Sequence, residues 1–337
     1  MWRYLHEHRF LGAGAISTEV VPAVQYVAGI QRVAVAARDL TAARKFAEKW
    51  GFMRAYGSYE ELVQDPEIEV IYIGTPNSLH YEHMMLCLRH GKGVICEKAF
   101  CLNAHQAQEV LSYAREHGLF VAEAVWTRYM PSRAAIAQIL ASGMIGRPYM
   151  LTANLFYPLS GVARVTDPKL GGGALLDVGV YPLNFALMCF GTEIERVESS
   201  VQLYPTGVDA MENITLHYCD GRMAALTAGI FSRSDRKGII HGELGYLVVE
   251  NINNPRSVSV YHHRSAGGFV MQDELVQHLD FPQPVNGYEY EFEEICGCYD
   301  RGETQAVSMP WDETLRVMRL FDELRAQWGV RYPQDSQ

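Results

Sequence analysis

The feature that most constrains the fold of this chain is the alternation of short apolar runs with amphipathic helical stretches over the first 125 residues. Residues 70–73 form a continuous apolar run, which is typical of a strand covered on both faces of a parallel sheet. Further strands are expected at 33–37, 93–96 and 119–122, with helices at 41–50, about 81–90 and 103–117. Strands and helices in this order predict a doubly wound α/β domain.

Beyond residue 126 the pattern changes. Helices are expected at 132–142, 288–299 and 311–328, and strands at 149–156 and repeatedly from 197 to about 271. Short alternating strands in succession predict a mostly antiparallel sheet. We therefore divide the 337 residues into an α/β nucleotide-binding domain at 1–125 and an α+β substrate domain at 126–337, with the chemistry in the cleft between them.

Charge and composition exclude several classes of protein. The net charge of −10 argues against a nucleic-acid or anionic-membrane surface. No apolar run approaches the roughly 20 residues that span a bilayer, and residues 1–8 lack a signal-peptide core. The seven scattered cysteines suit a reducing cytoplasm, and Cys296 and Cys298 are interpreted as buried thiols rather than as metal ligands. We expect a cytoplasmic protein with a small-molecule substrate and no metal.

A glycine-containing turn near the N-terminus resembles a phosphate-binding turn. In such a turn the first glycine permits a sharp bend, the second lets the backbone approach a pyrophosphate, and a third small residue packs helix against strand. Gly12, Gly14 and Ser17 fill these places, and Ala15 and Ile16 complete the expected cofactor contacts. The preceding stretch, residues 6–11, is too polar for a central buried strand. The alternating strands and helices around the turn nevertheless favour a dinucleotide site.

The residues after the second expected strand bear on the choice of cofactor. A carboxylate there would accept a hydrogen bond from a ribose 2′-hydroxyl and favour NAD, whereas a guanidinium would pair with a 2′-phosphate and favour NADP. Arg38 comes first after the strand, and Asp39 is placed to cap the following helix. We favour NADP(H) over NAD(H), with a merely solvated Arg38 as the alternative.

Two loops follow strands of the expected parallel sheet, at the edge where cofactors bind. Thr75, Pro76 and Asn77 follow the strand 70–73, and His80 belongs to the same loop, where we favour a capping or packing role over a catalytic one. Glu97 and Lys98 follow the strand 93–96. An ammonium at that edge can donate to an oxygen that develops alkoxide character beside a nicotinamide. The alternative for Lys98 is a surface ion pair with Glu97.

An acid and a phenol lie four residues apart in a glycine-rich segment, residues 171–181. On a helix Asp177 and Tyr181 would share one face, and Asp177 would lie at the N-terminal edge, where the helix dipole stabilises a carboxylate. A tyrosine beside Lys98 can accept a proton from an alcohol, because the ammonium is expected to lower the pKa of the phenol. The alternative for Tyr181 is a core tyrosine bonded to a backbone carbonyl.

Together these motifs resemble the Gfo/Idh/MocA oxidoreductase family along essentially the whole chain. The matching features are Gly12-x-Gly14, the loop 75–80, Glu97-Lys98, the segment 171–181 and the turn 242–245. The resemblance implies a Rossmann domain, a C-terminal open sheet used in dimerisation, NAD(P) as cofactor and a catalytic role for Lys98. Ala99 departs from the family pattern, which has proline after the Glu-Lys pair.

Within the family the chain is similar to the branch of dimeric dihydrodiol dehydrogenases and NADP-dependent D-xylose dehydrogenases. The similarity rests on residues 126–129 and on tyrosine at position 181, where inositol-dehydrogenase relatives have histidine. It implies that Lys98 and Tyr181 handle the proton, and that Asp177 lines the site. It also implies that Trp126, Arg128 and Phe156 flank the substrate.

We therefore expect an NADP(H)-dependent oxidoreductase that acts on a CH–OH group of a sugar or a cyclic trans-diol. Two alternatives stay open at this point. One is an enzyme that keeps a tightly held NAD(H) while it processes glycosides or inositols, and the other is a non-catalytic NAD(P)-binding regulator.

Overall fold

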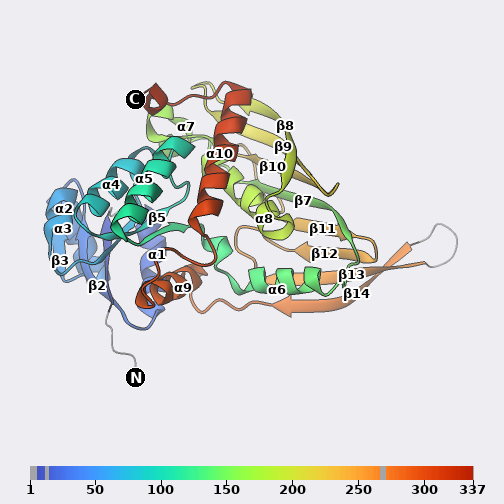
Figure 1. Cartoon of the computed structure of the whole chain (residues 1–337), viewed down its shortest axis with the longest axis horizontal. Coiled ribbons are helices and arrows are strands. Elements are labelled where there is room, and N and C mark those ends of the chain that lie inside the picture. The colour runs from blue at the N-terminus through green and yellow to red at the C-terminus, as the bar shows by residue number, and fades with distance from the viewer. Residues whose placement is uncertain (1–5, 12–14, 266–270, 337) are drawn as a thin grey trace.

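The computed structural model describes residues 6–11, 15–265 and 271–336. A domain with a parallel sheet lies beside a domain built on a larger, strongly twisted sheet (Figure 1). The two sheets correspond to the two parts that the sequence pattern distinguishes.

The N-terminal sheet has six strands within the described residues, in the order β3-β2-β1-β4-β5-β6, and their pairing is parallel throughout. The strands are β1 (His6–Leu11), β2 (Ile30–Ala36), β3 (Arg54–Tyr56), β4 (Val70–Ile73), β5 (Gly93–Glu97) and β6 (Val121–Ala124). Every residue of β4, β5 and β6 is buried, as continuous apolar runs predict for strands covered on both faces. The predicted doubly wound sheet is confirmed.

The position of β1 corrects one expectation. Residues 6–11 are too polar for a typical central strand, yet β1 lies between β2 and β4. It pairs with β2 from His6 to Leu11 and with β4 from His8 onward, with one register shift between His8 and Arg9 on the β2 side. Backbone hydrogen bonds to two neighbours do not depend on the side chains, so the place in the sheet overrides a weak strand propensity.

Five helices of the N-terminal domain are described: α1 (Ala15–Tyr26), α2 (Leu40–Trp50), α3 (Tyr59–Gln64), α4 (His80–Arg89) and α5 (Ala104–His117). Their ends follow from local sequence. Asp39 caps α2 by accepting from the N–H of Thr41, and Gly51 ends this helix in the left-handed conformation. Ser58 caps α3 in the same way.

The C-terminal sheet has eight described strands in the order β14-β13-β12-β11-β7-β10-β9-β8. They are β7 (Pro148–Phe156), β8 (Ile194–Leu203), β9 (Asp209–Tyr218), β10 (Met223–Gly229), β11 (Gly238–Gly242), β12 (Gly245–Val249), β13 (Ser257–Ser265) and β14 (Met271–Asp280). Only β7 and β10 pair in parallel among these, so the mostly antiparallel sheet is confirmed. The sequence pattern did not predict β14.

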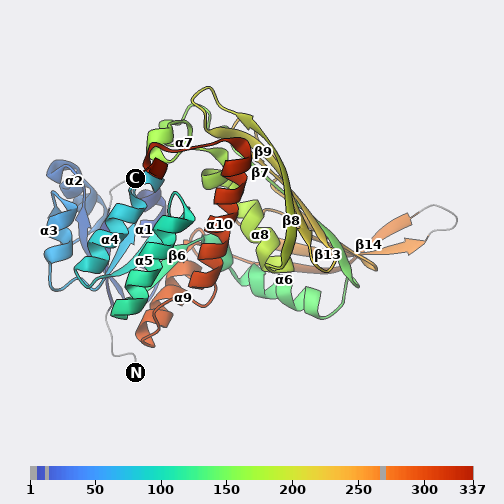
Figure 2. The same cartoon turned by 45° about the horizontal axis from the view of Figure 1, so that its top comes forward.

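Helices cover one face of the C-terminal sheet and connect it to the N-terminal domain. They are α6 (Pro131–Ala141), α7 (Ala163–Thr166), α8 (Val180–Phe190), α9 (Tyr288–Asp300) and α10 (Trp311–Trp328). Figure 2 shows α10 between the two domains; it packs on α5, while α9 packs on α1. Trp311 on α10 donates from Nε1 to the carbonyl of Val121 at 2.8 Å. The contacts of α9 and α10 with the N-terminal domain thus hold together the two domains that form the cleft.

One helical stretch among the described residues, Pro168–Phe190, is long and apolar enough by composition to cross a membrane. Most of its apolar window, 89%, is buried inside the protein, so we assign it to the core.

Candidate active site

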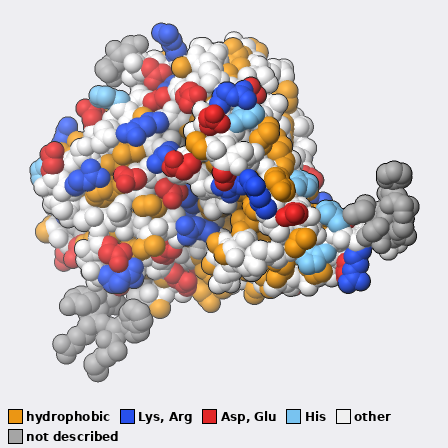
Figure 3. All heavy atoms as spheres, turned by 45° about the vertical axis from the view of Figure 1, so that its right-hand side comes forward, with side chains coloured by type: hydrophobic (Ala, Val, Ile, Leu, Met, Phe, Trp, Pro, Cys, Tyr) orange, Lys and Arg blue, Asp and Glu red, His pale blue; other side chains and the backbone are white. Residues whose placement is uncertain are grey.

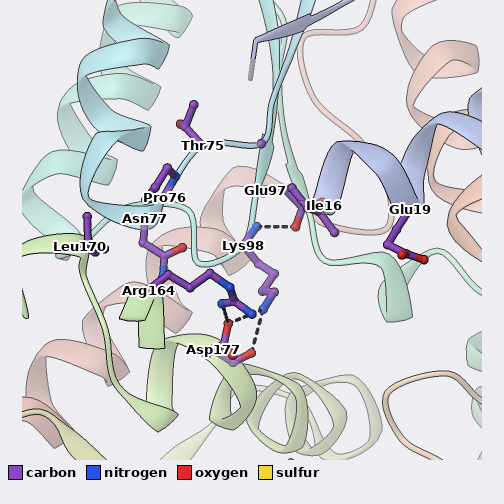
Figure 4. Close-up of a pocket in the computed structure, with 11 residues that line it drawn as sticks. Ile16, Glu19, Thr75, Pro76, Asn77, Glu97, Lys98, Arg164, Leu170 and Asp177 are labelled. Atoms are coloured by element: carbon purple, nitrogen blue, oxygen red, sulfur yellow. Dashed lines mark hydrogen bonds and ion pairs between the residues drawn. The ribbon is translucent and has the colours of Figure 1, made fainter. Parts of the chain in front are cut away.

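A cavity of about 390 Å³ lies at the carboxyl edge of the parallel sheet and extends to the C-terminal domain (Figure 4). It is lined by Ile16, Glu19, Gly74, Thr75, Pro76, Asn77, Glu97, Lys98, Arg164, Leu170 and Asp177. The strand order reverses between β1 and β4, and the cavity opens beside the segments that follow these two strands. Nucleotides bind at such a switch point in open α/β sheets.

The loop after β4 carries the predicted cofactor residues. Thr75, Pro76 and Asn77 all line the cavity, and the amide of Asn77 donates to the carbonyl of Gly171 across the domains at 3.3 Å. Gly74 is required by close packing, because a Cβ there would lie 2.9 Å from Cγ2 of Ile16 on α1. The loop therefore lies directly against the helix that follows the glycine turn.

His80 supports this loop rather than lining the cavity. Its ring is fully buried, with Nδ1 2.8 Å from the carbonyl oxygen of Ala99 and Nε2 2.8 Å from that of Thr75. Burial lowers the pKa of the imidazole. The ring joins the loop after β4 to the residue that follows Lys98, which agrees with the packing role favoured from the sequence.

Lys98 extends from the end of β5 to the opposite domain. Its Nζ donates to the backbone carbonyl of Asp177 at 2.7 Å and lies 3.6 Å from Asp177 Oδ1. The peptide bond between Lys98 and Ala99 is cis. The neighbouring Glu97 is buried; it accepts from the hydroxyl of Tyr72 at 2.6 Å and from the Lys98 N–H at 3.3 Å, and burial raises its pKa. The alternative of a surface Lys98–Glu97 ion pair does not describe this geometry.

Asp177 occupies a π-helical turn, η4 (Leu175–Gly179), just before α8. Its carboxylate pairs with Lys98 and also accepts from Arg164 of α7 (Figure 4). Burial by itself would raise the pKa of Asp177, but the positive charges of Lys98 and Arg164 hold it below the ordinary value. Asp177 is therefore ionised at neutral pH.

Tyr181 lies in the first turn of α8, with its ring centroid 5.0 Å from Lys98 Nζ. Burial raises the pKa of its hydroxyl well above the ordinary value, and Tyr288, Glu97 and Asp177 raise it further. The expectation that Lys98 lowers this pKa is wrong for this geometry, because the ammonium is directed at Asp177 and the phenol is buried among acidic groups. The structure does bring Lys98, Asp177 and Tyr181 together.

The three residues expected to flank the substrate have different surroundings. Trp126 stacks on Tyr288 with ring centroids 4.2 Å apart and donates from Nε1 to Oδ1 of Asn253 at 3.1 Å. Phe156 ends β7 and packs against Gly229, where a Cβ would lie 2.7 Å from its ring. Neither side chain lines the cavity described here.

Arg128 is placed away from the cavity, in the interior. Its side chain is 1% exposed, with Nε donating to Oδ1 of Asn184 at 2.8 Å and the guanidinium paired with Glu313 of α10. A buried guanidinium needs such partners, because an unpaired buried charge is strongly destabilising. Arg128 thus links α8 to α10, and it does not lie at the expected substrate site.

The remaining cofactor residues are only partly described. Gly12 and Gly14 lie outside the described residues, while Ala15 begins α1 and Ile16 lines the cavity. Arg38 is exposed and forms no hydrogen bond or ion pair with any residue that the structure describes. Asp39, in contrast, is engaged as the cap of α2.

Five residues at or beside the site were not predicted: Glu19, Gly74, Arg164, Leu170 and Asn253. Arg164 and Leu170 belong to the segment between β7 and α8, which has no periodic pattern. A contact such as that between Arg164 and Asp177 depends on how this segment folds back. No local sequence signal identifies it.

Both domains match models of one oxidoreductase family, and the relatives found match almost the whole chain. Residues 9–124 match the oxidoreductase family model with an NAD-binding Rossmann fold, and residues 134–248 match the GFO/IDH/MocA C-terminal domain. Trans-1,2-dihydrobenzene-1,2-diol dehydrogenase of Mus musculus is 33% identical over 91% of this chain and 91% of its own length. The Danio rerio protein of the same name is 34% identical over 96% of this chain and 95% of its own length.

Solved structures resemble the whole fold. A 3-ketoreductase from Actinomadura kijaniata, in complex with NADP and TDP-benzene, has a TM-score of 0.85 at 24% identity, covering 95% of this chain and 97% of that chain. Aldose-aldose oxidoreductase from Caulobacter crescentus has a TM-score of 0.83 at 19% identity, covering 98% of this chain and 99% of that chain. Fold, family models and relatives agree: the chain belongs to the Gfo/Idh/MocA family of NAD(P)-dependent oxidoreductases.

Proposed function

We propose that the protein transfers a hydride between NADP(H) and a CH–OH group of a cyclic trans-diol or a sugar. The observation that carries the proposal is the meeting of Lys98 and Asp177 at the cavity beside the switch point of the sheet, with the ring of Tyr181 next to Lys98 although Tyr181 itself does not line the cavity. Relatives that align over almost the whole chain are named for oxidation of a cyclic trans-diol.

The residues present fit a dinucleotide. The cavity lies where such cofactors bind, with Ile16 of α1 on one side and Thr75–Asn77 on the other. Ile16, the loop 75–77 and Glu97 would hold the cofactor, and Lys98 would act at its reacting end rather than in holding it. When bound, its oxidised nicotinamide supplies the hydride acceptor and a positive charge.

The side chains would then divide the proton chemistry. Tyr181 accepts the proton from the substrate hydroxyl during oxidation and returns it during carbonyl reduction. Lys98 donates to the substrate oxygen on which negative charge develops. Ionised Asp177 fixes the ammonium of Lys98, and Arg164 keeps Asp177 ionised.

The cofactor preference rests on residues 38 and 39. The guanidinium of Arg38 is exposed, whereas the carboxylate of Asp39 caps α2. A 2′-phosphate can pair bidentately with an arginine, whereas one oxygen of the Asp39 carboxylate already accepts from the backbone of α2. These contacts favour NADP(H).

Replacing Arg38 by alanine is expected to weaken NADPH binding by about tenfold or more while leaving NADH binding unchanged, because hydrogen bonds to charged groups contribute about 1.5–3 kcal/mol. Fluorescence titration with each reduced nucleotide measures both dissociation constants. Arg44→Ala is the matched control, since Arg44 is another exposed arginine, on α2. Wild-type protein that binds NADH more tightly than NADPH would contradict the preference.

The assembly and compartment are part of the same proposal. Exposed apolar side chains occur on the C-terminal sheet, for example Tyr149 on β7, Met211 on β9 and Leu275 on β14. Figure 3 shows hydrophobic side chains gathered on the part of the surface that the C-terminal domain forms. Exposed apolar surface of this kind favours association with a second copy of the chain. We propose a homodimer formed through this sheet, in the cytoplasm.

A further inference from the structure

Two buried carboxyl groups of β9 lie directly behind the turn that carries Asp177. Asp209 is completely buried and Glu212 is 2% exposed. Residues three apart on a regular strand point to opposite faces of a sheet. A register shift opposite Gln202 and Leu203 leaves Ala210 without a partner on β8. This bulge allows Asp209 and Glu212 to face the same side.

Two glycines of the segment 171–181 leave the space that these two carboxyl groups occupy. A Cβ on Gly173 would lie 2.4 Å from Asp209 Oδ1, and a Cβ on Gly179 would lie 2.1 Å from Glu212 Oε1. The other oxygen of Asp209 accepts from the N–H of Leu175 at the start of the turn. The carboxyl groups therefore occupy the places that side chains at positions 173 and 179 would fill.

The turn between these glycines presents two oxygens to the catalytic lysine. The backbone carbonyl of Asp177 accepts from Lys98 Nζ at 2.7 Å, and the carboxylate of Asp177 lies 3.6 Å from the same atom. Single π-helical turns of this kind are frequent at functional sites. Whatever holds the turn in this form also holds the ammonium of Lys98.

We propose that Asp209 and Glu212 are positioning residues that hold the π-helical turn so that Asp177 faces Lys98. The inference rests on the proposed function. Neither residue touches the cavity, so both act through the turn rather than on the substrate. Both oxygens of Glu212 and Oδ1 of Asp209 lack a hydrogen-bond partner among the described residues, so a second negative charge, on Glu212, would be costly here.

The charges around the pair decide which carboxyl group holds the proton. Burial raises the pKa of Asp209 to about 6, and the nearby groups are Glu212 on β9, Arg325 on α10 and Tyr332 near the C-terminus. Burial raises the pKa of Glu212 well above its ordinary value, and the charge of Asp209 raises it further. Above about pH 6, Asp209 is an anion that accepts from Leu175, while burial and the charge of Asp209 favour the neutral form of Glu212.

The pH dependence of kcat tests this arrangement. When Asp209 takes up a proton, its hydrogen bond to Leu175 weakens and the turn loosens. We therefore expect the kcat of the wild type to fall about fourfold between about pH 7.5 and about pH 5.5. This loss is counted after subtracting any loss that Asp209→Asn shows over the same range. The amide oxygen of asparagine accepts from Leu175 at every pH. Glu212→Gln keeps an uncharged group of the same size against Gly179, so the acid loss of kcat should persist in this variant.

A second measurement does not depend on activity. The pKa of Asp209 is raised in the folded state, so its stabilising contribution is present at low pH and is lost as the pH rises through about 6. The Tm of the wild type minus that of Asp209→Asn should therefore fall between about pH 4 and about pH 7 and level off above that. Asp209→Ser, whose hydroxyl accepts a hydrogen bond without titrating, replaces Asp209→Asn if that variant is insoluble.

The inference is overturned if Asp209→Asn shows the same acid loss of kcat as the wild type, or if the Tm difference is independent of pH. A Glu212→Gln variant that lacks the acid loss of kcat would also contradict it. If the wild type oxidises no diol or sugar, the proposed function fails, and the Tm comparison still decides whether the pair titrates as inferred.

Discussion

Replacing Lys98 by methionine is expected to lower kcat by about 10²–10⁴-fold, the usual contribution of a positioned proton-handling group. Methionine keeps the length of the side chain but removes the ammonium that contacts Asp177 and faces the ring of Tyr181. Without this charge, the alkoxide that develops on the substrate is not stabilised. Steady-state oxidation at saturating NADP⁺ measures the loss.

The control for this variant is Lys169→Met. Lys169 is an exposed lysine of the segment that borders the cavity, and its substitution should leave kcat unchanged. The NADPH dissociation constant of Lys98→Met should stay close to that of the wild type, so that the loss is assigned to chemistry. A decrease in kcat of less than about tenfold would contradict the role of Lys98.

Replacing Tyr181 by phenylalanine is expected to cost a similar factor, about 10²–10⁴ in kcat, because only the hydroxyl that accepts the proton is lost. Burial and the acidic neighbours raise the pKa of this hydroxyl. Oxidation by the wild type should therefore speed up toward alkaline pH, where more of the phenolate forms, and reduction should be favoured at lower pH.

The pH profile separates this role from a packing role. Tyr181→Phe should lose the alkaline rise in kcat, whereas a tyrosine that only fills space would leave the shape of the profile intact. Tyr204→Phe is a suitable control, because it removes a hydroxyl that donates to the backbone carbonyl of Ser160 at 2.9 Å on a tyrosine that is not a neighbour of Lys98. Retention of the alkaline rise in Tyr181→Phe would assign the proton to another group.

Most of the fold could be predicted because its signals are local. Buried parallel strands such as β4 appear as continuous apolar runs, and caps such as Asp39 and Ser58 are set by hydrogen bonds within three residues. The exception, β1, is placed by pairing on both sides, which is a property of the assembled sheet. The strand β14 was missed for a similar reason, since it is held by pairing with β13.

The site was predictable where its residues lie at strand ends or in a compact motif. Lys98 follows β5, and Asp177 and Tyr181 lie within one glycine-rich segment, so their order along the chain already indicates the cleft. Arg164 and the true surroundings of Arg128 were not predictable, because each depends on a partner distant in sequence or on an irregular segment. The pKa of Tyr181 likewise depends on burial that the sequence does not display.

The most direct test of the central claim is the rate of NADP⁺ reduction by a cyclic trans-diol, followed by the absorbance of the reduced nicotinamide in wild type and Lys98→Met. The proposal predicts turnover by the wild type and a loss of about 10²–10⁴-fold in the variant at equal NADPH affinity. A wild type that binds neither NADPH nor NADH, or a variant that turns over as fast as the wild type, would contradict it.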